Sequence, residues 1–276
     1  MTYLPEVEVI RKDLEKEVQG KRFKAINVKS ANAVARHRNR PEFYKALDGR
    51  KIEALTRRGR LLLFELDEDQ TLVVSLGSRG ALSRESANSE AGPDTQFTAS
   101  FTTGGALHLI DPAKDGELFV VPTAELETIP ELSTGGIDAL ADTFTWHAFA
   151  QELVLRQQPL ALLLRDETFI LGLGDLYSDE ILWSAGLSAR RLSNSLTSQE
   201  VRRLYRAIFE VLYEAVKQGG IEVPEEDYDE DEDQEYGEFV KVYERVGEQC
   251  LRCRRPIVRI DVEPGVAVFT CSACQT

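Results

Sequence analysis

Two closely spaced cysteine pairs near the end of the chain constrain its fold more than any other feature. Cys250 and Cys253 form the first pair, Cys271 and Cys274 form the second, and seventeen residues separate the pairs. These are the only 4 cysteines of the chain, and β-type sequence adjoins each pair at residues 257–262 and 266–270. Four thiolates at this spacing are typical of a tetrahedral zinc site at the end of a β-hairpin. We therefore predict a zinc-binding hairpin, rather than disulfides or free thiols.

The length and composition indicate an ordinary globular protein. A chain of 276 residues can form two medium-sized domains, each with a core of its own. No apolar run approaches the roughly 18 residues of a membrane span, and no charged-then-apolar signal segment opens the sequence. We expect a cytoplasmic monomer with no membrane partner.

Charge is unevenly distributed along the chain. Eleven acidic residues and no Lys or Arg lie between Glu222 and Glu238, so most of the formal charge of −14 is local. We predict that residues 222–238 form a mobile acidic loop, which is either a solvated spacer or a docking segment for a basic protein partner. In contrast, Lys21 to Arg60 contains thirteen basic and three acidic residues. This basic patch either faces a nucleic acid or is a solvated surface.

The hydrophobic pattern changes its period near Phe144. A helix that begins around Pro5 is followed by short β-type runs at 61–66, 71–76, 96–102, 106–110 and 117–121, and these predict an antiparallel sandwich. Helical patterns then appear at 157–165, from Asp179, and after a capping box formed by Thr197 and Glu200, with a stop at Gly219–Gly220. The predicted fold class is α+β, with an N-terminal antiparallel β-sandwich flanked by helices and a C-terminal helical domain that carries the hairpin.

Several segments of the chain resemble the formamidopyrimidine-DNA glycosylase and endonuclease VIII family. They include LPEVEVIRKDL at the start, LHLIDP in the middle and FILGLGDLYSDEILWSAG, which is similar to the signature of the family's helix-two-turn-helix module. The resemblance implies an N-terminal β-sandwich domain and a C-terminal helical domain with a zinc hairpin. We place the sandwich at residues 1–130, the helix-two-turn-helix domain at 140–222 and the hairpin at 241–276, with the acidic loop that the composition predicts at 223–240. The resemblance also implies a DNA groove between the two domains.

The resemblance implies a chemistry whose central residues are replaced here. In family enzymes the residue after the initiator methionine is usually a proline whose amine attacks the sugar C1′, and the next residue is a glutamate that transfers protons. Thr2 and Tyr3 occupy these positions. A phenol with an ordinary pKa of about 10 is a poor substitute for a carboxylate near neutral pH.

Positions that hold DNA in the family differ as well. A lysine, an asparagine and an arginine that bind phosphate correspond to Arg60, Asp175 and Val266, and an ionised carboxylate can only accept hydrogen bonds. The residues that fill the gap left by a flipped nucleotide correspond to Ser78, Ala113 and Asp115. We expect weak, salt-dependent DNA binding through the remaining cations, which are Arg57, Arg58, Arg60 and Arg36.

Two functions compete on this basis. The leading hypothesis is a catalytically degenerate family member that acts as a zinc-containing binding or scaffold protein, so the sequence leans against an enzyme. The alternative is an active DNA base-excision glycosylase and abasic-site lyase. In that case removal of Met1 exposes the primary amine of Thr2, and Glu6 or Glu8 replaces the missing glutamate.

Overall fold

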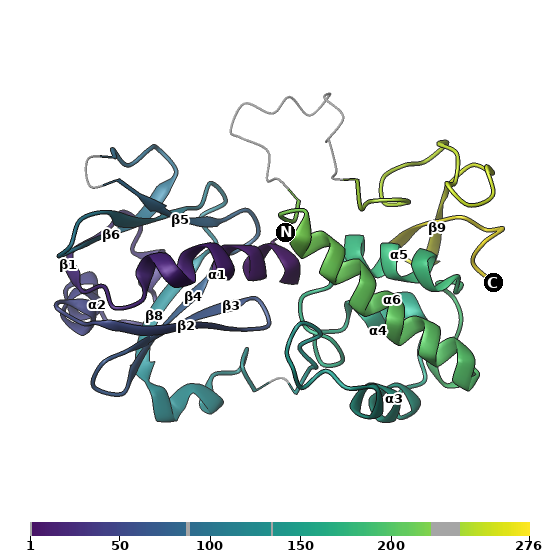
Figure 1. Cartoon of the computed structure of the whole chain (residues 1–276), viewed down its shortest axis with the longest axis horizontal. Helices are drawn as coiled ribbons and strands as arrows, with labels where there is room; N and C mark the ends of the chain where they lie inside the picture. Colours follow the sequence, from purple (N-terminus) through teal and green to yellow (C-terminus); the bar gives the residue numbers. More distant parts are fainter. Residues whose placement is uncertain (1, 87–88, 134, 222–237) are drawn as a thin grey trace. The chain divides into compact units, whose positions relative to one another are not determined.

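The computed structural model describes residues 2–86, 89–133, 135–221 and 238–276. These residues divide into two compact units, one within Met1–Ser133 and the other within Thr134–Glu222 and Asp229–Thr276 (Figure 1). The acidic loop predicted at 222–238 lies outside the described residues, except for Glu238. No helix in the described part of the chain is long and apolar enough to cross a lipid bilayer.

Two four-stranded antiparallel sheets form the first unit, with strand orders β1-β6-β7-β5 and β2-β3-β4-β8. The strands are β1 (Phe23–Val28), β2 (Ile52–Arg58), β3 (Leu61–Leu66), β4 (Gln70–Ser75), β5 (Ala81–Glu85), β6 (Thr95–Phe101), β7 (Ala106–Ile110) and β8 (Glu117–Pro122). Helix α1 (Leu4–Val18) packs against β2 and β5, and α2 (Arg40–Leu47) packs against β1 and β8 (Figure 1). The predicted antiparallel β-sandwich flanked by helices is confirmed.

Strand β3 has an almost continuously apolar sequence because both of its faces are buried. Leu62 and Phe64 are buried in the main core with residues of α1, β6 and β7, whereas Leu61 and Leu63 point to the other face of the strand. There they pack with Ile129 and other residues of a short segment after β8. Both faces of β3 are therefore covered, so the strand needs apolar side chains at nearly every position.

Three strands and one α-helix of the first unit were not predicted, namely β1, β2, β5 and α2. Most of them lie in the basic region between Lys21 and Arg60, where charged residues interrupt the apolar pattern. In β2, for example, only Ile52 and Leu55 are fully buried. Helix α2 is capped by Asn39, whose side chain accepts a hydrogen bond from the Glu42 backbone N–H.

The second unit contains four α-helices and a two-stranded hairpin among its described residues. The elements are α3 (Trp146–Val154), α4 (Leu160–Arg165), α5 (Gly174–Ala185), α6 (Ser198–Lys217), β9 (Val258–Glu263) and β10 (Val266–Thr270). The capping box of Thr197 and Glu200 is present at the start of α6, as predicted. Helix α4 begins after Pro159, later than predicted, because the residue before a proline disfavours the helical conformation. Helix α5 begins at Gly174 instead of Asp179.

Candidate functional site

Thr2 and Tyr3 lie directly before α1. The Thr2 side chain is 3% exposed, and its hydroxyl donates a 3.5 Å hydrogen bond to the carbonyl oxygen of Gly80. Tyr3 is the N-cap residue, and its carbonyl accepts the first helical hydrogen bond from the backbone N–H of Val7 at 3.3 Å. The start of the chain is thus fixed both to the helix and to the loop that contains Gly80.

The two glutamates of the first turns of α1 have different surroundings. Glu8 forms ion pairs of 2.9 Å with Arg11 and with Arg57, whose side chain is only 4% exposed. Burial alone would raise the pKa of Glu8, but the hydrogen bonds from Arg11 and Arg57 hold it below its ordinary value. Glu8 is therefore kept ionised as the partner of a buried arginine. Glu6 is 7% exposed and lies one helical turn after Thr2.

Three of the four cations predicted to bind DNA form ion pairs with glutamates. Arg57 pairs with Glu8, and Arg58 pairs with Glu127 at 2.8 Å. Arg36 pairs with Glu117 at 3.0 Å and with Glu131 at 2.5 Å, and its guanidinium carbon lies 4.0 Å from the centroid of the Phe119 ring. Arg60 is partly buried in the turn between β2 and β3. A phosphate must compete with these internal partners, so the assignment of the four arginines to DNA stays a prediction.

The loops after β4 and β7 meet at two of the positions that correspond to the gap-filling residues. The carboxylate Oδ1 of Asp115 accepts a hydrogen bond from the backbone N–H of Ser78 at 3.0 Å. Ala113 is exposed in the same loop as Asp115. Asp115 therefore serves as a bridge between two loops.

Asp175 lies in the first turn of α5, and its carboxylate is engaged within the second unit. Oδ2 accepts a hydrogen bond from the Tyr243 hydroxyl at 2.9 Å, and Oδ1 accepts one from the Leu176 backbone N–H at 3.0 Å. A negative side chain is favourable at this end of a helix. Val266 begins β10 and is half-buried opposite Glu263, which places no cation at that position.

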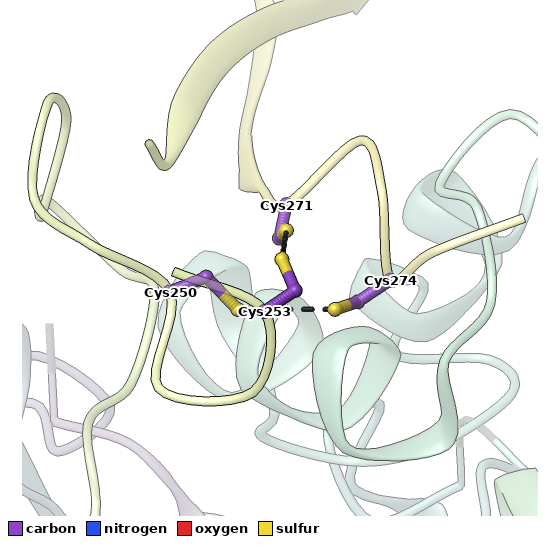
Figure 2. Close-up of side chains that lie close together, drawn as sticks. All are labelled: Cys250, Cys253, Cys271 and Cys274. Atoms are coloured by element: carbon purple, nitrogen blue, oxygen red, sulfur yellow. Dashed lines mark hydrogen bonds between the residues drawn. The ribbon is translucent and has the colours of Figure 1, made fainter. Parts of the chain in front are cut away.

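The four cysteines come together at the base of the hairpin, from two turns that are distant in sequence (Figure 2). Their sulfur atoms all lie within 4.8 Å of one another, with 3.4 Å between Cys253 and Cys271 and 3.9 Å between Cys250 and Cys274. A tetrahedral zinc with Zn–S bonds of about 2.3 Å separates its sulfurs by about 3.8 Å. The four side chains therefore fit a metal ion, whereas a disulfide needs about 2.05 Å.

Trp183 of α5 supports this cluster. Its indole N–H donates a 3.5 Å hydrogen bond to the Cys250 sulfur, and its ring packs 4.0 Å beneath the guanidinium carbon of Arg252. Burial opposes ionisation, but the indole and nearby backbone N–H groups lower the pKa of Cys250 to about 6. Burial raises the pKa of Cys274 to about 12, so that thiol needs a cation nearby to ionise at neutral pH.

Two buried carboxylates of α5 hold the hairpin in place, and the sequence analysis missed both. Asp179 accepts hydrogen bonds from Arg165 at 2.9 Å and from the Phe269 backbone N–H at 2.7 Å. Glu180 is 1% exposed and accepts three backbone N–H groups, those of residues 241–243, at 2.8–2.9 Å. The sequence carried a signal for them, because the two adjacent acidic residues directly precede the apolar residues Ile181 and Leu182 of the same helix.

Comparisons with known proteins cover the whole chain. Residues 1–118 match the formamidopyrimidine-DNA glycosylase N-terminal domain, and residues 136–226 match the formamidopyrimidine-DNA glycosylase H2TH domain. A formamidopyrimidine-DNA glycosylase of Pelotomaculum thermopropionicum is 33% identical over 275 residues, which are 100% of this chain and 99% of that protein. One of Thermus thermophilus is 35% identical over 277 residues, which are 100% of this chain and 98% of that protein.

Solved structures give the same result. The structure of MutM in complex with DNA that contains carbocyclic 8-oxo-G has a TM-score of 0.86 and 26% identity, with 100% of both chains covered. The crystal structure of the MutM (Fpg) protein of Thermus thermophilus has a TM-score of 0.82 and 35% identity, with 99% of this chain and 98% of that chain covered. The chain thus belongs to the formamidopyrimidine-DNA glycosylase family of DNA-repair proteins.

Proposed function

We propose that this chain is a DNA base-excision glycosylase and abasic-site lyase whose nucleophile is the primary amine of Thr2, exposed by removal of Met1. The placement of Thr2 carries the proposal, because it is buried at the start of α1 in a chain that matches DNA glycosylases from end to end. An α-amino group has an ordinary pKa of about 8, so part of it is neutral at physiological pH. This proposal replaces the catalytically degenerate protein that we favoured from the sequence.

The chemistry requires one amine and one group that transfers protons. The Thr2 nitrogen forms a bond to C1′ of a damaged nucleotide, while the N-glycosidic bond breaks and the departing base takes up a proton. The C1′–O4′ bond then breaks, the nitrogen loses a proton and O4′ takes one up, and the open sugar is left joined to Thr2 as an imine. Among the two candidate carboxylates, we assign proton transfer to Glu6, because ion pairs with Arg11 and Arg57 keep Glu8 ionised.

A second candidate function is DNA binding without catalysis. The replacement of the catalytic glutamate by Tyr3 and the hydrogen bond between Asp175 and Tyr243 favour it, because they remove a proton-transfer group and a phosphate-binding amide. In both cases we propose that DNA binding is weak and strongly dependent on salt concentration.

The test is reduction of the imine by borohydride, which links protein and DNA covalently. Protein with Thr2 as its first residue is released from a cleavable tag and incubated with abasic-site DNA, beside protein that retains Met1. We expect a covalent adduct and strand cleavage only with the processed protein. No adduct from processed wild type, but an adduct from Thr2→Pro/Tyr3→Glu, would favour DNA binding without catalysis.

We further propose that one zinc ion is held by Cys250, Cys253, Cys271 and Cys274. Four thiolates leave no coordination position open for water, so the metal would stabilise the hairpin and take no part in the reaction. Metal analysis of the purified protein should find one zinc per chain. Failure to find any bound metal would contradict this assignment. A basic protein partner, a monomeric state and a cytoplasmic location stay predictions.

A further inference from the structure

The loops at residues 76–80 and 111–116 are held together so closely that they act as one rigid element. Besides the hydrogen bond from Ser78 to Asp115, Gly77 lies against the second loop with φ of +71°. A Cβ atom at Gly77 would collide with Asp115 Oδ1 and would lie 2.7 Å from the Gly116 nitrogen. No side chain fits there, so the close approach of the two loops depends on this glycine.

The second loop is also fixed from within. Asp111 is 1% exposed, and its two carboxylate oxygens accept the backbone N–H groups of Lys114 at 2.9 Å and Gly116 at 2.8 Å. Lys114 has a left-handed backbone with φ of 58°, which is uncommon for a residue with a side chain. Such strain persists only where the surroundings hold it, and it is often found at functional sites.

Each loop carries one exposed cation, Arg79 in the first and Lys114 in the second. Among the described residues neither side chain forms an ion pair, whereas Arg36, Arg57 and Arg58 are each paired with a glutamate. A phosphate that binds Arg79 or Lys114 does not have to displace an internal carboxylate. These two cations are therefore better placed to bind an anion than the arginines predicted from the sequence.

The first of these loops contacts Thr2, the residue whose amine is the proposed nucleophile. Gly80, next to Arg79, accepts the hydrogen bond from the Thr2 hydroxyl. A rigid element that touches Thr2 and presents two cations can fix a charged substrate at a set position relative to the reacting amine.

We propose that Arg79 and Lys114 bind phosphate groups of DNA beside Thr2, and that Asp115 is a positioning residue that locks their two loops together. This inference rests on the proposed function, because it takes DNA as the ligand. It assigns a role to two residues that sequence reasoning did not single out as binding residues.

The experiment measures binding of the full-length, Met1-processed protein to a duplex with a tetrahydrofuran abasic-site analogue, over a range of KCl concentrations. Each phosphate contact contributes about 0.9 to the slope of log Kd against log salt. We expect Arg79→Ala and Lys114→Ala each to lower that slope by about 1 and to weaken binding several-fold at about 100 mM KCl. Arg79→Lys should retain the slope, and Lys16→Ala, which removes an exposed cation of α1, should leave it unchanged.

Asp115→Asn and Asp115→Ala test the positioning role, because they change the charge equally but only Asn keeps an oxygen acceptor for Ser78. We expect the Asn variant to bind more tightly than the Ala variant. Equal affinities would overturn the role of Asp115, and a wild-type slope in both Arg79→Ala and Lys114→Ala would overturn the phosphate contacts. Wild type that binds no DNA even at low salt would instead overturn the proposed function itself.

Discussion

The ion pair between Arg57 and Glu8 is a charged pair that stabilises the fold and is not free to bind a ligand. The two side chains are 4% and 12% exposed, and their atoms lie 2.9 Å apart. Removing one partner from such a pair leaves the other charge buried without compensation. The folded state then loses far more stability than it does when an exposed pair is lost.

Glu8→Gln should therefore destabilise the protein by about 2–4 kcal/mol. Glu15→Gln is the matched control, because Glu15 pairs with Arg11 on the same helix but is 46% exposed. We expect Glu15→Gln to lower the free energy of unfolding by no more than about 0.5 kcal/mol. Urea unfolding of both variants measures the difference, and similar stabilities for the two would contradict a structural role for Glu8.

Glu6 is expected to matter for chemistry and not for folding. Glu6→Gln should reduce the rate of adduct formation on abasic-site DNA by a factor of about 100 or more, because general acid–base catalysis contributes factors of this size. The amide has nearly the same shape, so the melting temperature should change little. Wild-type rates for Glu6→Gln would show that another group transfers the proton.

Asp179 is expected to make stability depend on pH. Burial raises the pKa of Asp179 to about 7, although Arg165 and the Phe269 N–H act in the opposite direction. A carboxyl group whose pKa is higher in the folded than in the unfolded state contributes stability below the unfolded value of about 3.9, and this is lost as pH rises through 7.

Wild type should thus lose stability relative to Asp179→Asn between about pH 4 and pH 7, by up to about 1.4 kcal/mol per pH unit, and the difference should stay constant above pH 7. Comparison with the Asn variant removes contributions from other titrating groups. Urea unfolding at several pH values measures the difference, and a difference that does not vary with pH would show that Asp179 stays ionised throughout.

At the scale of elements, the hairpin of β9 and β10 has too small a core to be stable alone. Its buried cluster consists of Trp183, Val242, Cys250, Ile257 and Cys271, and two of these five are cysteines. The carboxylates of Asp179 and Glu180 attach the hairpin and the preceding segment to α5 through backbone hydrogen bonds. A bound metal ion would cross-link the two cysteine pairs and so add the stability that this small apolar cluster does not provide.

We expect Cys271→Ser, or a strong chelator added to wild type, to accelerate amide hydrogen exchange in β9 and β10 by at least about tenfold. Strands β3 and β4 belong to the other unit and have their own core, so their exchange should not change. Unaltered exchange in the hairpin after loss of the metal would mean that the carboxylate anchors are sufficient.

At the scale of the whole molecule, the sequence predicted what regular patterns encode and missed what depends on long-range pairing. Runs such as residues 61–66 and 106–110 coincide with β3 and β7, and the spacing of the cysteines predicted their cluster. The charged strands β1 and β2 were not predicted, because their apolar faces can be recognised only when the partner strands are known. For the same reason, the sequence could not show that Arg36 lies beside Glu117, or that Asp115 bridges two loops.

The overall charge leads to a last prediction, which concerns the acidic run. Residues 225–235 contain nine acidic side chains and no basic ones, in a chain whose formal charge is −14. Their repulsion should slow the approach of DNA, an effect that is strongest when the salt concentration is low. Replacement of residues 225–235 by a Gly/Ser linker of equal length should raise the association rate for duplex DNA about tenfold at roughly 20 mM salt, and much less at roughly 300 mM.

A linker in which Glu and Asp are replaced by Gln and Asn is the control for length and polarity, and it should have the same effect. Stopped-flow fluorescence measures the rates. An equal gain at both salt concentrations would mean that the acidic run obstructs DNA sterically, whereas a slower association would mean that it assists binding.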